Sequence, residues 1–283
     1  MLFMNFSEQV EKSLHCDVLL FIATPTEKKM LKAASESLGL SFNKLQGRAF
    51  CYYDIGQVGT YRVMAVKTEM GPFAHDGSAA HAIIAKTETN ATALVSLGMA
   101  FGVSPELQKT GHIIVSKILL PYDNRRIYSE GGKIMTDYNS VRPYQAKQSL
   151  IFVLSNYAAR NEWASKVSFG GILTGGARIQ CSAYRDELAR SLSNHGEVVV
   201  GGEMEGVGLL SASDPDDPCW IIVKGISDFA DERRAADSEQ AKKDFARNRE
   251  LACDNAAKFV LSALKYFDPN ILYEEPTAER RAP

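Results

Sequence analysis

Carboxylates follow two apolar runs in the second half of the chain. Glu203 and Glu205 come shortly after residues 198–200, and Asp228 closes the run that begins at residues 220–223. A strand reached through a crossover helix tends to return parallel to the first, so both runs are expected to end at one edge of a sheet. Open α/β sheets bind ligands at that edge. Carboxyl groups placed there suit general acid–base chemistry.

A third carboxylate, Glu27, stands near the start of the chain, after a strand expected over residues 17–23. Thr24 suits the N-cap of a following helix, Pro25 its first position and Glu27 its third, which is the pattern of a capping box. At the carboxyl end of a strand, Glu27 also suits the role of a catalytic base. Spacing alone favours the cap and leaves the base as the alternative.

The run Glu203-Met204-Glu205-Gly206, followed by Ile226-Ser227-Asp228 at this spacing, resembles the signature of the nucleoside phosphorylase/nucleosidase superfamily. The likeness is above all to the 5′-methylthioadenosine/S-adenosylhomocysteine nucleosidase-like branch, and it extends over residues 18–267. It implies a three-layer α/β/α sandwich around a twisted mixed, mostly parallel sheet. It also implies hydrolytic cleavage of the N-glycosidic bond of a purine (adenine-type) nucleoside or nucleotide, with release of the free base.

The resemblance assigns the chemical roles. Asp228 is expected to protonate N7 of the departing purine, and Glu27 is expected to activate the attacking water. The resemblance favours this role of Glu27 as a base over its role as a helix-capping residue. Glu205 is expected to accept hydrogen bonds from the ribose 2′- and 3′-hydroxyls. This is the two-carboxylate logic of glycoside hydrolysis applied to a C–N bond. Together with Glu205, the expected substrate-binding residues are Met204, Glu203, Ile179, Arg178, Met99, Gly98 and Ser227.

Three positions depart from the pattern of the resembled branch. Gly98 and Met99 begin a glycine-bracketed loop over residues 98–102, where the family usually carries a small hydroxyl residue near Met99. Arg178 stands where an aromatic residue usually packs on the base, beside the aliphatic Ile179. A guanidinium stacks on a base or binds an anion, so a phosphorylated nucleotide is an open alternative to methylthioadenosine. Lys224 stands where relatives often carry arginine, as an anchor for Glu205 or a substrate contact.

Two other functions remain open. Phosphorolysis is disfavoured because Ser96 occupies the position at which phosphorylases carry a phosphate-binding arginine, and it is favoured only if another basic residue holds phosphate. A nucleoside-sensing module without turnover is the second alternative, and it is disfavoured by the intact set of Glu27, Glu205 and Asp228. Assays with and without phosphate, and of binding without base release, separate the three.

Composition bounds the remaining possibilities. The 283 residues are 45% hydrophobic and 23% charged, with a formal net charge of −2, so neither nucleic acid nor a membrane is an expected partner. The five cysteines form no CxxC pair, so neither a zinc site nor a disulfide framework is expected, and reduced thiols fit a cytoplasmic protein. No metal and no cofactor are expected. The expected partner is a small-molecule nucleoside or nucleotide. By resemblance the chain is expected to form a homo-oligomer, either a dimer or a hexamer.

The elements that must position these residues follow from periodicity and turn signals. Residues 1–16 are expected to form a helical lead-in, residues 17–267 the nucleosidase-like domain, and residues 268–283 a disordered tail. A strand is expected over 91–97, an Ala-rich helix over 74–86 that carries His75, and a helix from Glu203 to about residue 211. Residues 121–142 are expected to be a long loop, and residues 240–266 a long amphipathic helix.

Overall fold

The computed structural model describes residues 14–73, 75–232 and 238–266. Most of the expected lead-in helix and all of the expected tail from residue 268 lie outside the described residues. A ten-stranded sheet forms the centre of the molecule, in the order β11-β10-β6-β12-β5-β1-β4-β3-β2, with β9 paired to β6. The strands are β1 (Val18–Ile22), β2 (Asn43–Gln46), β3 (Cys51–Val58), β4 (Tyr61–Lys67), β5 (Ala93–Gly102), β6 (Ile113–Pro121), β9 (Tyr144–Gln145), β10 (Val167–Thr174), β11 (Val199–Glu203) and β12 (Trp220–Asp228).

Most neighbouring strands in the middle of the sheet are parallel, and the exception is β12, which pairs antiparallel with β6. β1 pairs in parallel with β4 and β5, β5 with β12, and β10 with both β6 and β11. Strands covered on both faces read as continuous apolar runs, and all five residues of β1 are buried. The antiparallel pairs β2–β3 and β3–β4 extend the sheet at one side. The expected mixed, mostly parallel sheet is therefore confirmed.

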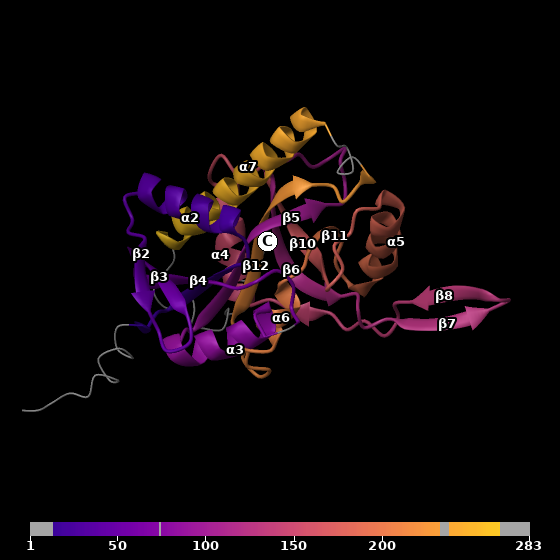
Figure 1. The fold of residues 1–283 in the computed structure, drawn as a ribbon, viewed down its shortest axis with the longest axis horizontal. Coiled ribbons are helices and arrows are strands. Elements are labelled where there is room, and N and C mark those ends of the chain that lie inside the picture. The colour runs from indigo at the N-terminus through magenta and orange to yellow at the C-terminus, as the bar shows by residue number, and fades with distance from the viewer. Residues whose placement is uncertain (1–13, 74, 233–237, 267–283) are drawn as a thin grey trace, which may run out of the picture.

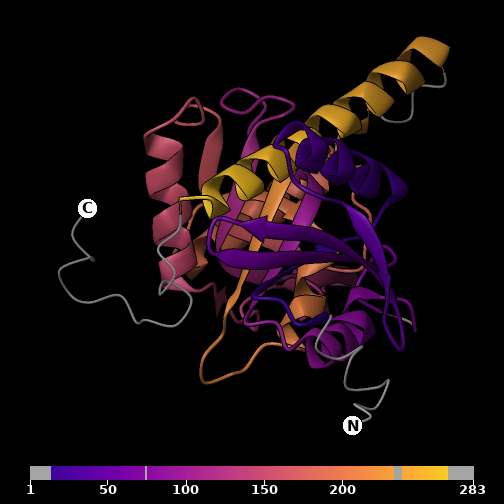
Figure 2. The ribbon, with the colours of Figure 1, turned by 90° about the vertical axis from the view of Figure 1, so that its left-hand side faces the viewer.

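Helices cover both faces of this sheet, which gives the expected three layers (Figures 1 and 2). α2 and α7 pack against each other on one face, and α7 also packs on β12 and β5. α3 and α6 pack together on the opposite face, at the bottom of Figure 1. The helices are α2 (Pro25–Ser37), α3 (Ser78–Thr89), α4 (Gln148–Ala159), α5 (Ser182–Leu192), α6 (Gly206–Leu210), α7 (Glu239–Leu264) and the short 3₁₀ turn η1 (Ser193–His195).

One end of the sheet closes on itself and so brings β11 next to β5. Gly201 pairs with Gly102, and Gly202 with Phe101, in antiparallel register. A Cβ atom on Gly201 would overlap the carbonyl oxygen of Phe101, so glycine permits this close approach. The closure sets the end of β11, with Glu203, next to the last residues of β5.

Three expected boundaries were wrong. Residues 98–102 are not a loop but the last part of β5, because their backbone continues to pair with β12 and β11. The helix expected from Glu203 begins only at Gly206, because Glu203 still pairs in β11 with Thr174. The helix expected over 74–86 begins at Ser78, so His75 precedes it.

The long loop expected over residues 121–142 was also wrong, because it contains a hairpin. β7 (Arg126–Glu130) pairs antiparallel with β8 (Lys133–Asp137), and the two strands project from the body of the molecule (Figure 1). Gly131 and Gly132 form the turn with φ of 56° and 75°. Two consecutive residues with positive φ suit a tight hairpin turn, and this Gly-Gly pair was the available sequence signal.

Candidate active site

A cleft lies where several strands of the sheet end, and it gathers nearly every residue singled out in the sequence. It encloses about 760 Å³ of non-protein space including its open mouth. Residues from β5, β11 and β12 line it together with α2, α7 and the segment after β10. The lining residues are Thr24, Glu27, Met70, Met99, Ala100, Phe101, Ala177, Arg178, Ile179, Gly202, Glu203, Met204, Glu205, Ser227, Asp228, Phe245 and Arg249.

Glu27 is a capping residue and a cleft residue at once. Thr24 caps α2, its side chain accepts a hydrogen bond from the Glu27 amide, and the capping box is complete. Glu27 Oε2 accepts hydrogen bonds from the amides of Ala23 at 2.7 Å and Thr24 at 2.8 Å. Glu27 Oε1 accepts one from the Met99 amide at 3.0 Å. The predicted cap is therefore confirmed, and the same carboxylate lines the cleft.

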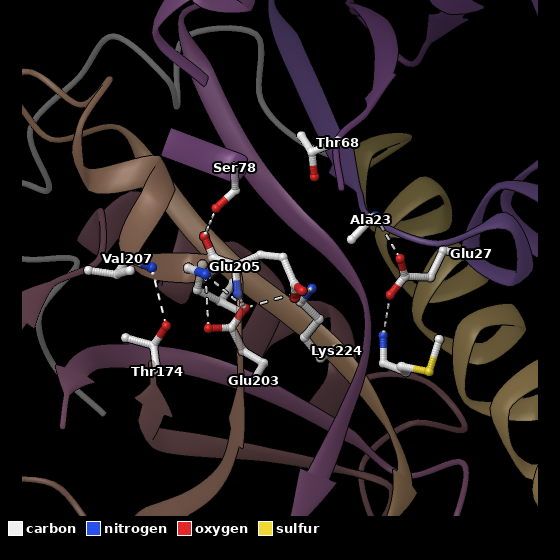
Figure 3. Close-up of polar contacts among 12 residues, drawn as sticks. Ala23, Glu27, Thr68, Ser78, Thr174, Glu203, Glu205, Val207 and Lys224 are labelled. Carbon is white, nitrogen blue, oxygen red and sulfur yellow. Dashed lines mark hydrogen bonds and ion pairs between the residues drawn. The ribbon is translucent and has the colours of Figure 1, made fainter. Parts of the chain in front are cut away.

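A buried cluster of Glu203, Glu205 and Lys224 forms another part of the site, separate from Glu27 (Figure 3). Lys224 is fully buried, and its Nζ lies 3.2 Å from Glu205 Oε2 and 3.8 Å from Glu203 Oε2. Glu203 also accepts hydrogen bonds from the amides of Glu205 at 3.0 Å and Gly206 at 2.9 Å. Lys224 does not line the cleft, so its position matches the predicted anchor for Glu205.

The cluster shifts the proton affinities of two of its members. Burial by itself lowers the pKa of Lys224, but the surrounding negative charges, chiefly Glu205, raise it by more, so the net shift is upward. Burial raises the pKa of Glu203; the charge of Lys224 opposes this shift and that of Glu205 adds to it. Lys224 is thus held as a cation, and Glu203 binds a proton more readily than an ordinary glutamate does.

Asp228 ends β12 at the cleft. Its Oδ2 accepts a hydrogen bond from Ser227 Oγ at 2.9 Å, and its Oδ1 accepts one from the Ala230 amide at 2.9 Å. Ser227 Oγ also lies 3.2 Å from the carbonyl oxygen of Ala100 on the adjacent β5. These contacts fix the direction of the carboxyl group at the strand end.

Of the other predicted residues, Met204, Met99, Arg178 and Ile179 also line the cleft. Gly98 does not line the cleft, but its lack of a side chain leaves room for the carboxylate of Glu27. A Cβ atom on Gly98 would overlap the Glu27 carboxylate, and its φ of +149° is rarely adopted by other residues. The structure therefore brings the predicted set together, with Gly98 behind Glu27.

Sequence reasoning missed Phe245 and Arg249, which reach the cleft from α7. They are four positions apart and so share one face of the helix. That spacing was visible in the sequence, but nothing local to residues 239–264 shows that this helix crosses the cleft. Met70 and Phe101 were also missed, because no local sequence pattern shows that they lie at the cleft.

Other features of the described residues bear on what the site does. Ser96 is fully buried and does not line the cleft. Within residues 14–73, 75–232 and 238–266, no group of three or more His, Cys, Asp or Glu side chains is arranged to hold a metal ion. Over the same ranges, none of the helices combines the length and apolarity that crossing a bilayer requires.

The fold resembles that of solved nucleosidases. The 5′-methylthioadenosine/S-adenosylhomocysteine nucleosidase from Neisseria meningitidis, in complex with methylthio-immucillin-A, is similar with a TM-score of 0.68 and 19% identity, over 88% of this chain and 99% of that chain. S-adenosylhomocysteine nucleosidase from Streptococcus pyogenes, in complex with 5-methylthiotubericidin, is similar with a TM-score of 0.68 and 19% identity, over 90% of this chain and 98% of that chain. Futalosine hydrolase of Helicobacter pylori is similar with a TM-score of 0.66 and 16% identity, over 90% of this chain and 100% of that chain.

At these identities the likeness concerns the fold. Among curated proteins, no sequence gives a significant match. The sequence of residues 17–265 does match a family described as the phosphorylase superfamily, and this match takes in every element of the central sheet. The chain therefore belongs to the phosphorylase superfamily.

Proposed function

We propose that this protein is a purine nucleosidase that hydrolyses the N-glycosidic bond of an adenine-type nucleoside or nucleotide and releases the free base. The observation that carries the proposal is that Glu27, Glu205 and Asp228, from three distant parts of the chain, line one cleft. The nucleosidase structures with a similar fold, two of them named with nucleoside-like ligands, support the same reaction class.

The reaction needs help on both sides of the bond that breaks. Water attacks C1′ of the sugar, the C1′–N9 bond breaks, and its electron pair moves to the purine. Asp228 gives a proton to N7 of the departing base, and Glu27 takes a proton from the water as the new C–O bond forms. The products are the free base and a sugar with a hydroxyl at C1′, so atoms and charge balance.

Glu205 is assigned to the sugar hydroxyls. Its carboxylate is held by Lys224 at 3.2 Å and by the Gly71 amide at 3.3 Å, while its side chain still lines the cleft. Met204 is assigned to the sugar face. Arg178 and Ile179 are assigned to the base side, where Asp228 is also required.

Water is the proposed nucleophile. A phosphorylase needs a cation to bind inorganic phosphate beside C1′. Ser96, at the position where phosphorylases carry arginine, is a buried hydroxyl outside the cleft lining, so this position supplies no cation. Arg178 and Arg249 also line the cleft, so phosphorolysis stays the alternative that the assay with phosphate separates. The test is base release from adenosine, inosine, methylthioadenosine, AMP and ATP, with and without inorganic phosphate. Free sugar as product in both buffers supports hydrolysis, whereas a sugar 1-phosphate supports phosphorolysis and ligand binding without base release supports a sensing module.

We also propose that the protein acts in the cytoplasm as a homo-oligomer, a dimer or a hexamer. The support is the superfamily membership and the five free cysteines, which suit a reducing compartment. Sedimentation velocity of the purified protein tests the oligomeric state, and a single monomeric species across concentration would refute it.

A further inference from the structure

Within the part of the chain that the structure describes, two arginines line the cleft without a carboxylate partner. Arg249 of α7 is partly buried, its Nε lies 3.2 Å from Met99 Sδ, and its guanidinium stands 5.6 Å from the centre of the Phe245 ring. A thioether sulfur is a weak acceptor, and a ring face leaves the N–H donors of a guanidinium unsatisfied. Among the described residues, no carboxylate forms an ion pair with Arg249, and the same holds for the exposed Arg178.

The carboxylates of the cleft make their hydrogen bonds and ion pairs with groups other than Arg178 and Arg249. Glu27 accepts three backbone hydrogen bonds, Glu205 pairs with Lys224, and Glu203 is held by backbone amides. Asp228 accepts from the hydroxyl of Ser227 and from a backbone amide. The positive charge of the two guanidiniums is therefore left to face a ligand.

The position of Arg249 indicates which part of a ligand it meets. Its contact residue Met99 is also the residue whose amide binds Glu27, so Arg249 lies next to the side of the cleft assigned to the sugar. A substituent on C5′ is attached to the sugar, so it lies near the residues on the sugar side of the cleft. A partly desolvated guanidinium there suits a phosphate, which it binds through paired N–H···O contacts.

We infer that the substrate is a purine nucleotide rather than an uncharged nucleoside, and that Arg249 binds its 5′-phosphate. This inference rests on the proposed function, because it takes the sugar side of the cleft from the assignment of Glu27. Arg178 adds a second positive charge at the same cleft and strengthens the attraction for an anion. A phosphate would thus replace the missing carboxylate partner of Arg249.

The competing explanation is that Arg249 only packs over Phe245 as a cation–π pair. Packing alone would affect nucleosides and nucleotides equally. The discriminating measurement is therefore kcat/KM for base release from adenosine, methylthioadenosine, AMP, ADP and ATP, for the wild type and the variants Arg249→Gln and Arg249→Lys. The matched control is Arg247→Gln, which removes an equal charge from an exposed position of α7 outside the cleft.

The wild type is expected to prefer at least one nucleotide over adenosine by about tenfold or more, as one charge-assisted contact allows. Arg249→Gln should lower kcat/KM for that nucleotide by about tenfold or more, mainly by raising KM. The same variant should change kcat/KM for adenosine by less than about threefold. Arg249→Lys should recover part of the loss, and Arg247→Gln should behave as the wild type. A preference for adenosine or methylthioadenosine, or an equal loss on nucleoside and nucleotide, would overturn the inference.

Calorimetric titration with AMP, ADP and ATP separates this inference from the proposed reaction. Nucleotide binding that weakens about tenfold in Arg249→Gln but not in Arg247→Gln supports the phosphate contact whether or not base is released. Base release from adenosine alone, with no nucleotide binding, leaves the proposed reaction intact and refutes the phosphate contact. The contact should also weaken as salt rises from roughly 50 to 300 mM, since it is electrostatic.

Discussion

The backbone amide of Met99 donates a hydrogen bond to Glu27 Oε1 at 3.0 Å, although 72 positions separate the two residues. The other carboxylate oxygen of Glu27 is bound within the cap of α2. The side chain is thus fixed between the end of β1 and the end of β5, the two parallel neighbours in the sheet. A residue that looks like a helix cap in the sequence becomes a positioned carboxylate only through this contact.

Glu27→Gln should lower the rate of base release by about 10²-fold or more, because an amide does not accept a proton from water. Both carboxylate oxygens of Glu27 accept hydrogen bonds from backbone amides, so the NH2 group of glutamine would face one of these N–H donors and the melting temperature should fall modestly. Chromatography of the released base and a thermal melt measure the two effects. Retained turnover in a folded Glu27→Gln protein would remove the assignment of the base.

Asp228→Asn should abolish detectable base release while ligand binding remains, because the amide keeps the size and contacts of the side chain but does not protonate N7. A loss of about 10²–10⁴-fold is typical for a general acid. Single-turnover base release together with calorimetric binding of the substrate checks this. Full activity in this variant would show that another group protonates the base.

Gly98→Ala should reduce turnover by displacing Glu27, because the added Cβ would overlap that carboxylate. The control is Gly39→Ala, where φ is +72° and nothing lies within 4 Å of the added atom. Both variants carry backbone strain of roughly 1 kcal/mol, so urea unfolding should show a loss in each. Only Gly98→Ala should lose catalysis; equal turnover in both variants would contradict the steric role of Gly98.

Lys224→Met should destabilise the fold by about 3–5 kcal/mol at pH 7, because it leaves the buried carboxylates of Glu203 and Glu205 without their counter-charge. The loss should be smaller near pH 5, because burial raises the pKa of Glu203 and its protonation removes part of the uncompensated charge. Lys224→Arg keeps the charge and serves as the control. Urea unfolding at both pH values measures the difference, and a pH-independent loss would argue against a charge effect.

Glu203 should make the protein less stable as pH rises. Its pKa is raised in the folded state, so the folded protein binds more protons than the unfolded chain between the ordinary pKa of about 4.5 and the raised folded value. Its contribution is therefore fully present below the ordinary pKa and is lost as pH passes the folded pKa. Relative to Glu203→Gln, the wild type should lose at most about 1.4 kcal/mol per pH unit in this window. Urea unfolding at several pH values measures the slope, and parallel curves would contradict it.

Local sequence determined the elements of this protein and the residue types at their ends. The apolar run of β1, the Thr24–Glu27 capping box and the carboxylate at the end of β12 each depend on neighbours in the chain, so spacing and propensity predict them. The motif pair around Glu205 and Asp228 likewise pointed to the superfamily and to the cleft residues.

Tertiary structure decided how far the strands extend and what surrounds the cleft. Residues 98–102 contain two glycines and read locally as a loop, but pairing with β12 and β11 makes them part of a strand. Arg249 is an ordinary helical arginine in the sequence, and only the path of α7 brings it to Met99. Such contacts join residues about a hundred or more positions apart. Their energies depend on which surfaces the whole fold brings together, so no local pattern encodes them.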